Sequence, residues 1–307
     1  MPARGDDQCR TQDGRRAARR AHERRPRPRG AVRAPHGARP GRRGEAVKHV
    51  PTVAWRELRS LFVSPVAYGV LSLFAVLAGL FFVLSVAAFL NYVLQLEQFQ
   101  AMDQLEKVNL SDQLVAQFYD TMGVILLMAV PAITMGLFAA EKSNGTQELL
   151  LTSPLTIWDI VLGKFTAAAG FIAILVAMVA AFPGLLFVYG DPEVGKTVSG
   201  LLGLLLIGWT YVAIGAFASS LTRSMVVSFL ITIVFLLVIL LLPAIAEFGV
   251  LGRAGQVGDA LTWLSTGEHF QQLLKGLVDT GDLAYFAVII GSFLLLTKAS
   301  VESVRWR

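Results

Sequence analysis

The chain has 307 residues, of which 54% are hydrophobic and 16% are charged, and its mean hydropathy is +0.59. This composition excludes an ordinary water-soluble globular protein, because the apolar residues gather in long runs that contain no Asp, Glu, Lys or Arg. The net charge of +5 comes from residues 1–46, which hold 14 arginines and five acidic residues, whereas the rest of the chain is acidic overall.

Residues 1–46 contain no Leu, Ile, Phe, Trp or Tyr that could form a core, so this Arg- and Pro-rich extension is predicted to be disordered. A basic arm for nucleic acid or anionic lipid is one interpretation. The other interpretation, which we favour, is that the start of the chain was assigned too early and that Val47 is the true start. The only cysteine, Cys9, falls in this extension, which excludes disulfide bonds from the folded part.

Residues 53–62 have the pattern of an amphipathic helix that lies at a membrane surface. Ser64-Pro65 is expected to end this helix before the chain enters the membrane. A generic aromatic and basic anchor beside the first span is the alternative. The apolar stripe consists of Trp55, Leu58, Leu61 and Phe62, and the charged residues off it are Arg56, Glu57 and Arg59.

Six apolar runs have the length of membrane-spanning helices, since about 20 helical residues cross a bilayer. The last run is interrupted by Lys298, whose ammonium can reach the interface. The pattern predicts an all-α polytopic membrane protein over residues 47–307. The expected spans are residues 66–90, 121–140, 165–190, 197–222, 224–246 and 283–301.

A polar insert, residues 141–164, separates the second and third runs and is much longer than a tight helical hairpin needs. Asn144-Gly145 is a turn signal, Thr146 is a predicted N-cap, and Glu148 then falls in the first helical turn. Apolar residues including Leu149 and Leu150 follow, and Pro154 stops this short helix. Thr156, with Asp159 three residues later, is a capping pair that begins the next span. A structured loop without a partner is the alternative.

The distribution of Lys and Arg outside the spans predicts the orientation. With the N-terminus inside, nine basic residues after residue 46 fall on the inner face and four on the outer face. Both termini and the insert are therefore expected in the cytoplasm, and residues 91–120 and 248–282 outside. The inner residues are Lys48, Arg56, Arg59, Lys142, Lys164, Arg223, Lys298, Arg305 and Arg307; the outer ones are Lys107, Lys196, Arg253 and Lys275.

No catalytic, cofactor or metal constellation is apparent, so the chain is not expected to be an enzyme by itself. Residues 190–197 match the phosphate-loop pattern letter for letter, but two membrane helices flank them instead of a strand and a helix. His269 lies beside Phe270 and fits a half-buried interfacial helix better than a metal site. The spans carry no ionisable carboxylate or amine of the kind that proton-coupled transport requires.

The insert resembles the cytoplasmic coupling region of the ABC-2 type transporter permeases. The matching residues are Glu141, Gly145, Thr146, Glu148, Leu150 and Pro154. Residues 215–224 are similar to the family's turn between its fourth and fifth helices. Residues 264–270, 275–280 and 299–307 look like the gliding-motility-type branch. The likeness covers about residues 48–307.

The resemblance implies six spans, an N-terminal elbow helix, and a coupling helix that docks on a separate ABC ATPase. It implies a permease of the bacterial plasma membrane, for export rather than import, that pairs with a second copy or a homologue, with a possible auxiliary membrane protein and no nucleic acid. Two other functions stay open. The chain could be a non-transporting assembly or sensor subunit, or an ion-coupled secondary transporter.

Overall fold

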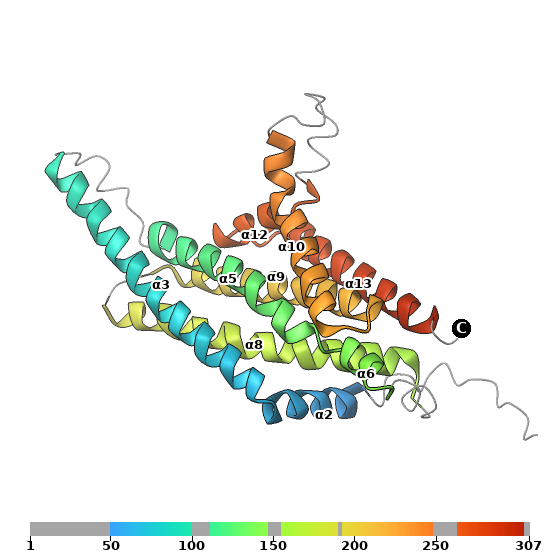
Figure 1. Ribbon diagram of the computed structural model, residues 1–307. Coiled ribbons are helices and arrows are strands. Elements are labelled where there is room, and N and C mark those ends of the chain that lie inside the picture. Colours follow the sequence, from blue (N-terminus) through green and yellow to red (C-terminus); the bar gives the residue numbers. More distant parts are fainter. Residues whose placement is uncertain (1–49, 100–110, 147–154, 190–191, 248–262, 304–307) are drawn as a thin grey trace, which may run out of the picture. The chain divides into compact units, whose positions relative to one another are not determined.

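The computed structural model describes residues 50–99, 111–146, 155–189, 192–247 and 263–303 (Figure 1). Its secondary structure within these ranges is helical throughout, and all six predicted spans are confirmed as helices long and apolar enough to cross a membrane. The extension 1–46 lies outside the described residues. The helices are α2 (Val50–Val63), α3 (Pro65–Gln98), η1 (Ser111–Val115), α5 (Ala116–Thr134), α6 (Ala139–Ser143), α8 (Ile157–Tyr189), α9 (Val194–Leu221), α10 (Met225–Glu247), α12 (Thr266–Leu274) and α13 (Thr280–Ser303).

Ser64 separates the first two helices, as its sequence context predicts. The Ser64 side chain accepts a hydrogen bond from the Val66 backbone N–H at 3.3 Å, and its own backbone is extended. Pro65 then occupies the first helical position, where its missing N–H costs nothing. The chain therefore leaves α2, bends at Ser64, and begins the long helix α3.

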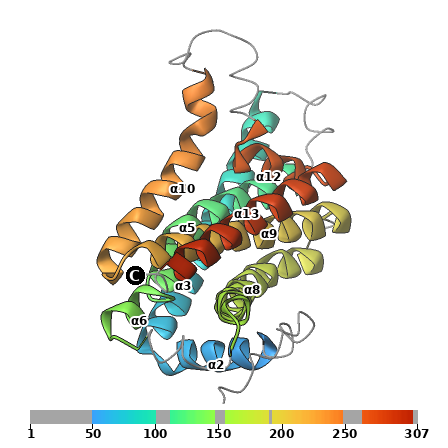
Figure 2. The ribbon, with the colours of Figure 1, turned by 90° about the vertical axis from the view of Figure 1, so that its right-hand side faces the viewer.

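Helices α5 and α9 form the centre of the bundle, and α3 and α10 lie at its periphery (Figure 2). In the most apolar stretch of each span, 67% of α9 and 61% of the α5–α6 segment is buried, against 11% of α3 and 17% of α10. Small residues let the central helices approach closely. A Cβ on Gly215 of α9 would lie 2.2 Å from the Thr134 hydroxyl oxygen of α5, so only glycine fits there.

Hydrogen bonds tie the helices together at both ends of the bundle. At one end, called the Lys164 end below, Ser300 of α13 donates to the Ser220 carbonyl of α9 at 3.0 Å, and α2, α6 and the start of α8 lie nearby. At the other, the His269 end, Gln271 of α12 donates to Asp120 of α5 at 2.7 Å. Consecutive spans run in alternating directions between these two ends (Figure 1).

Candidate coupling site

Helix α6 ends at Ser143, and Gly145, two residues later, has a φ of +70°, in the left-handed region that favours glycine. The Thr146 N–H donates to the Glu141 carbonyl at 3.1 Å, which is the long-range bond of a Schellman helix end. The Thr146 hydroxyl contacts the same carbonyl at 3.4 Å. The described bonds of Thr146 thus close α6; the helix that Thr146 was predicted to cap lies outside the described residues.

Helix α8 begins with the capping pair that the sequence predicted. The Thr156 backbone N–H and hydroxyl donate to Asp159 Oδ2 at 3.1 and 2.6 Å, and the Asp159 N–H donates back to the Thr156 hydroxyl at 3.2 Å. These reciprocal bonds satisfy donors that the first helical turn leaves unpaired. Asp159 is buried, so the start of α8 is fixed within the protein.

A buried lysine joins the two sides of the insert and the elbow helix. Lys164 of α8 is only 3% exposed, and its Nζ lies 2.7 Å from Glu141 Oε1 of α6 and 3.6 Å from Glu57 Oε2 of α2. A buried ammonium needs such partners, because an unpaired charge in the interior is strongly destabilising. Residues 141 and 164, the two ends of the predicted insert, are therefore held in direct contact.

Helix α2 packs closely against α8 at Gly163. A Cβ on Gly163 would lie 2.5 Å from Cγ1 of Val53, so the helices meet at a position where no larger residue fits. Leu58, Leu61 and Phe62 pack against the core, as members of the predicted stripe. Trp55, the fourth member of that stripe, is 69% exposed, and Val53 is the residue of α2 that meets Gly163.

The kinked span α5–α6 is held to α9 by one side chain of α9 and one of its own. Pro131 lies near the end of α5, and residues 135–138 form turns before α6 begins. The buried Ser219 hydroxyl of α9 donates to the Met135 carbonyl at 3.0 Å and accepts from the N–H groups of residues 138 and 139, both at 3.1 Å. The Lys142 ammonium donates to the Ser220 carbonyl at the end of α9. Helix α6 is therefore anchored to α9.

The remaining predicted site residues separate into two groups. Arg56 donates to Glu57 Oε1 at 2.8 Å, and Arg59 is exposed on the surface of α2. The residues predicted to lead the contact with a partner lie outside the described residues. These are Glu148, Leu149, Leu150 and Pro154.

The phosphate-loop lookalike is helical in the part that the structure describes. Residues 194–197 form the first turn of α9, and the preceding element, α8, is a helix instead of a strand. Lys196 lies 3.4 Å from Glu193, a carboxylate that would repel a phosphate. The local geometry thus differs from that of a nucleotide-binding loop.

The His269 end carries a buried pair that connects α12 with α13. Nδ1 of His269 lies 2.6 Å from Asp282 Oδ1, and Nε2 lies 3.0 Å from the Trp263 carbonyl oxygen. The Tyr285 ring stacks on the imidazole at 3.9 Å between centroids, and its hydroxyl donates to the Leu264 carbonyl at 2.6 Å. His269 is therefore a structural residue of the contact between α12 and α13, and its side chain is buried.

Residues 51–301 match the sequence model of the ABC-2 family transporter proteins. The chain belongs to the ABC-2 transporter family. It is 26% identical, over 206 residues, to the probable multidrug ABC transporter permease YbhR of Escherichia coli K12 and to its counterpart in E. coli O157:H7. These alignments cover 60% of the chain and 53% of each relative, so the chain spans about half the length of the curated relatives that it matches.

Sequence reasoning missed several of the residues that build this ABC-2 domain's Lys164 end. Lys164 was only one of nine basic residues on the predicted inner face, and nothing local indicated that Glu57 and Glu141 would share it. Its position just inside the start of an apolar helix was the one available signal, because a lysine there needs a nearby partner. Ser219 lies in a small-residue string with no local sign of its role at the α5–α6 break.

Proposed function

We propose that this chain is the membrane permease subunit of an ABC transporter, and that residues 141–164 bind a separate ATPase subunit. The ABC-2 family supports a transport role in the membrane. The observation that carries the finer proposal is the ion pair of 2.7 Å between Glu141 and Lys164. It closes the base of the insert, so a partner that moves residues 147–154 acts on α6 and α8 together.

The packing of the Lys164 end supports a path for that movement. Helix α8 carries the elbow helix with it through the Glu57 contact and the close approach of Val53 to Gly163. Helix α6 is joined to α9 through Ser219 and Lys142. A displacement produced by ATP-driven closure of the partner would thus reach α2, α5, α8 and α9 as linked rigid elements.

The proposal places the chain in the bacterial plasma membrane with both termini and the insert in the cytoplasm, on the basis of the nine-to-four distribution of basic residues. A second permease copy, or a homologue, would cover part of the exposed apolar surface of α3 and α10. Export, and membership of the gliding-motility-type branch, rest on the likeness of the C-terminal strings of residues 264–280 and 299–307.

Two other functions are weighed against this one. A secondary transporter needs carboxylates or amines along its path, whereas the buried carboxylate, ammonium and imidazole side chains that the structure describes, Asp159, Lys164, His269 and Asp282, lie near helix ends. A non-transporting assembly or sensor subunit would use the same insert for docking. It differs from a permease in showing no ATP-dependent substrate movement.

The test uses the full chain co-expressed with a candidate ABC ATPase subunit. Glu148→Arg and Leu150→Asp should abolish co-purification and ATP-dependent transport, because the first reverses a charge and the second places a charge in an apolar contact that is worth about 1.5–3 kcal/mol when fully buried. Lys196→Ala, in the phosphate-loop lookalike, should change neither. Unchanged coupling in both insert variants would contradict the proposal, as would ATP binding by the chain alone that is lost in Lys196→Ala.

A further inference from the structure

Two neighbouring cavities open at the Lys164 end, between the elbow region and the kinked span. One has a volume of about 190 Å³ and the other about 470 Å³. They adjoin one another, because the same four residues line both. The shared residues are Leu61, Ser64, Ile133 and Gly136.

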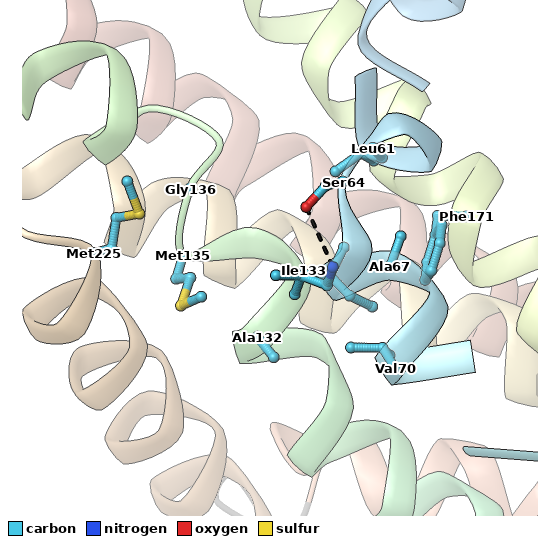
Figure 3. Close-up of a pocket in the computed structure, with 11 residues that line it drawn as sticks. Leu61, Ser64, Ala67, Val70, Ala132, Ile133, Met135, Gly136, Phe171 and Met225 are labelled. Atoms are coloured by element: carbon cyan, nitrogen blue, oxygen red, sulfur yellow. Dashed lines mark hydrogen bonds between the residues drawn. The ribbon is translucent and has the colours of Figure 1, made fainter. Parts of the chain in front are cut away.

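The smaller cavity is apolar. Its wall combines Val70 of α3, Ile133 of α5, Phe171 of α8 and Met225 of α10, and Figure 3 shows Met135 and Met225 on one side of it and Phe171 on the other. An apolar cavity of this size excludes water and accepts hydrocarbon. Methionine side chains adapt to flexible apolar ligands. The volume suits one hydrocarbon chain and is too small for a bulky polar ligand.

The larger cavity is bordered by four charges of alternating sign. Arg56 contacts Glu57 at 2.8 Å, Glu57 contacts Lys164 at 3.6 Å, and Lys164 contacts Glu141 at 2.7 Å. Two positive and two negative groups leave no net charge. The two carboxylates are about one-fifth exposed and Arg56 is 61% exposed, so groups of both signs are accessible to a ligand.

We propose that these adjoining cavities bind a zwitterionic membrane phospholipid, with one acyl chain in the smaller cavity and the head group in the larger one. The ammonium of the head group lies against Glu57 and Glu141, and its phosphate lies against Arg56. A head group with a single net charge is disfavoured, because the neutral border leaves that charge uncompensated. The second acyl chain stays in the bilayer, since Val66 and Met225 at the rim of the smaller cavity are exposed.

Gly136 provides a specific test of this site. It lines both cavities, and a Cβ built on it meets no atom within 4 Å, so a larger side chain there begins in open space. Gly291 of α13 also has open space around its Cβ but does not line either cavity. Gly136→Leu and Gly291→Leu are therefore a matched pair. Ala132→Leu fills the smaller cavity from a second position.

The experiment uses the purified full chain in maltoside micelles and a lysophosphatidylcholine that carries a photoreactive diazirine on its acyl chain. Labelling should concentrate on peptides containing Met135 and Met225. It should fall by about tenfold in Gly136→Leu and Ala132→Leu, the change that corresponds to about 1.4 kcal/mol of binding free energy, and stay unchanged in Gly291→Leu. Thermal unfolding of each variant identifies any that has lost its fold.

Competition with unlabelled amphiphiles of the same chain length tests the head group. Lysophosphatidylcholine should compete about tenfold better than lysophosphatidylglycerol or an alkyl trimethylammonium, as expected for the loss of one charge-assisted contact. Equal competition by all three would overturn the head-group assignment. Labelling that is unaffected in folded cavity-filling variants, or spread evenly over the exposed faces of α3 and α10, would overturn the site. These outcomes do not depend on an ATPase, so they leave the proposed coupling function to its own test.

Discussion

Neutralising Glu141 should loosen the Lys164 end without changing its shape. In Glu141→Gln the side chain keeps its size, but the buried Lys164 ammonium retains only the Glu57 carboxylate, at 3.6 Å instead of 2.7 Å. The expected loss in the free energy of unfolding is about 2 kcal/mol, which is in the range for hydrogen bonds to charged groups. It stays below the cost of breaking a fully buried pair, because Glu141 is partly exposed and solvent screens its charge.

Thermal unfolding in detergent micelles measures this loss. A change of about 2 kcal/mol lowers the midpoint of a chain of this size by about 4 °C. Glu57→Gln should have a smaller effect, since its contact with Lys164 is longer. A double-mutant cycle with Lys164→Met should show coupling between positions 141 and 164, because each single change already breaks the same ion pair.

An ion pair that is more exposed to solvent provides the control. Lys298 and Glu302 lie 3.7 Å apart on the surface of α13, and Glu302→Gln should change the unfolding free energy by less than about 0.5 kcal/mol. Two results would refute the reasoning. One is a Glu57→Gln effect larger than that of Glu141→Gln, and the other is strictly additive behaviour of the pair 141 and 164.

Three further substitutions test other contacts. Gly163→Leu should detach α2 from α8 at a cost of about 1–3 kcal/mol, because its side chain overlaps Val53, and hydrogen exchange should become faster in α2. Ser219→Ala should cost about 2 kcal/mol in thermal unfolding, since it leaves two buried N–H groups at the start of α6 without their acceptor. Asp282→Asn should weaken the His269 contact by about 1.5–3 kcal/mol and speed hydrogen exchange in α12.

Each of these substitutions has a control of the same type. Gly291→Leu adds the same side chain where space is open, and Ser303→Ala and Asp279→Asn change exposed residues. All three controls should stay within about 0.5 kcal/mol of the unchanged protein. If a control lost as much unfolding free energy as its partner variant, the loss in that variant would not come from the contact in question.

The architecture was predictable because membrane insertion imposes a strong local rule. Every span must satisfy its backbone hydrogen bonds within the helix and present apolar side chains, so six runs could be recognised without tertiary information. The start of α8 was predictable for a similar reason, since Thr156 and Asp159 bond to each other across one turn. Such signals are confined to a few consecutive residues.

The site depended on contacts that no local pattern contains. Glu57, Glu141 and Lys164 lie on three helices, and their pairing follows from how α2 and α6 pack beside α8. The amphipathic stripe of α2 predicted a preferred face for this helix but not which neighbour α2 meets. The close approach of Val53 to Gly163 is the contact that places α2 against α8.

The most direct measurement of the central claim is site-specific photo-crosslinking of the full chain in the presence of its ATPase. Benzoylphenylalanine replaces Leu149 in the insert or, in a separate variant, the exposed Leu277 at the His269 end. The account predicts an adduct with the ATPase from position 149 and none from position 277. An adduct from position 277, or the absence of one from position 149 in a complex that still assembles, would contradict it.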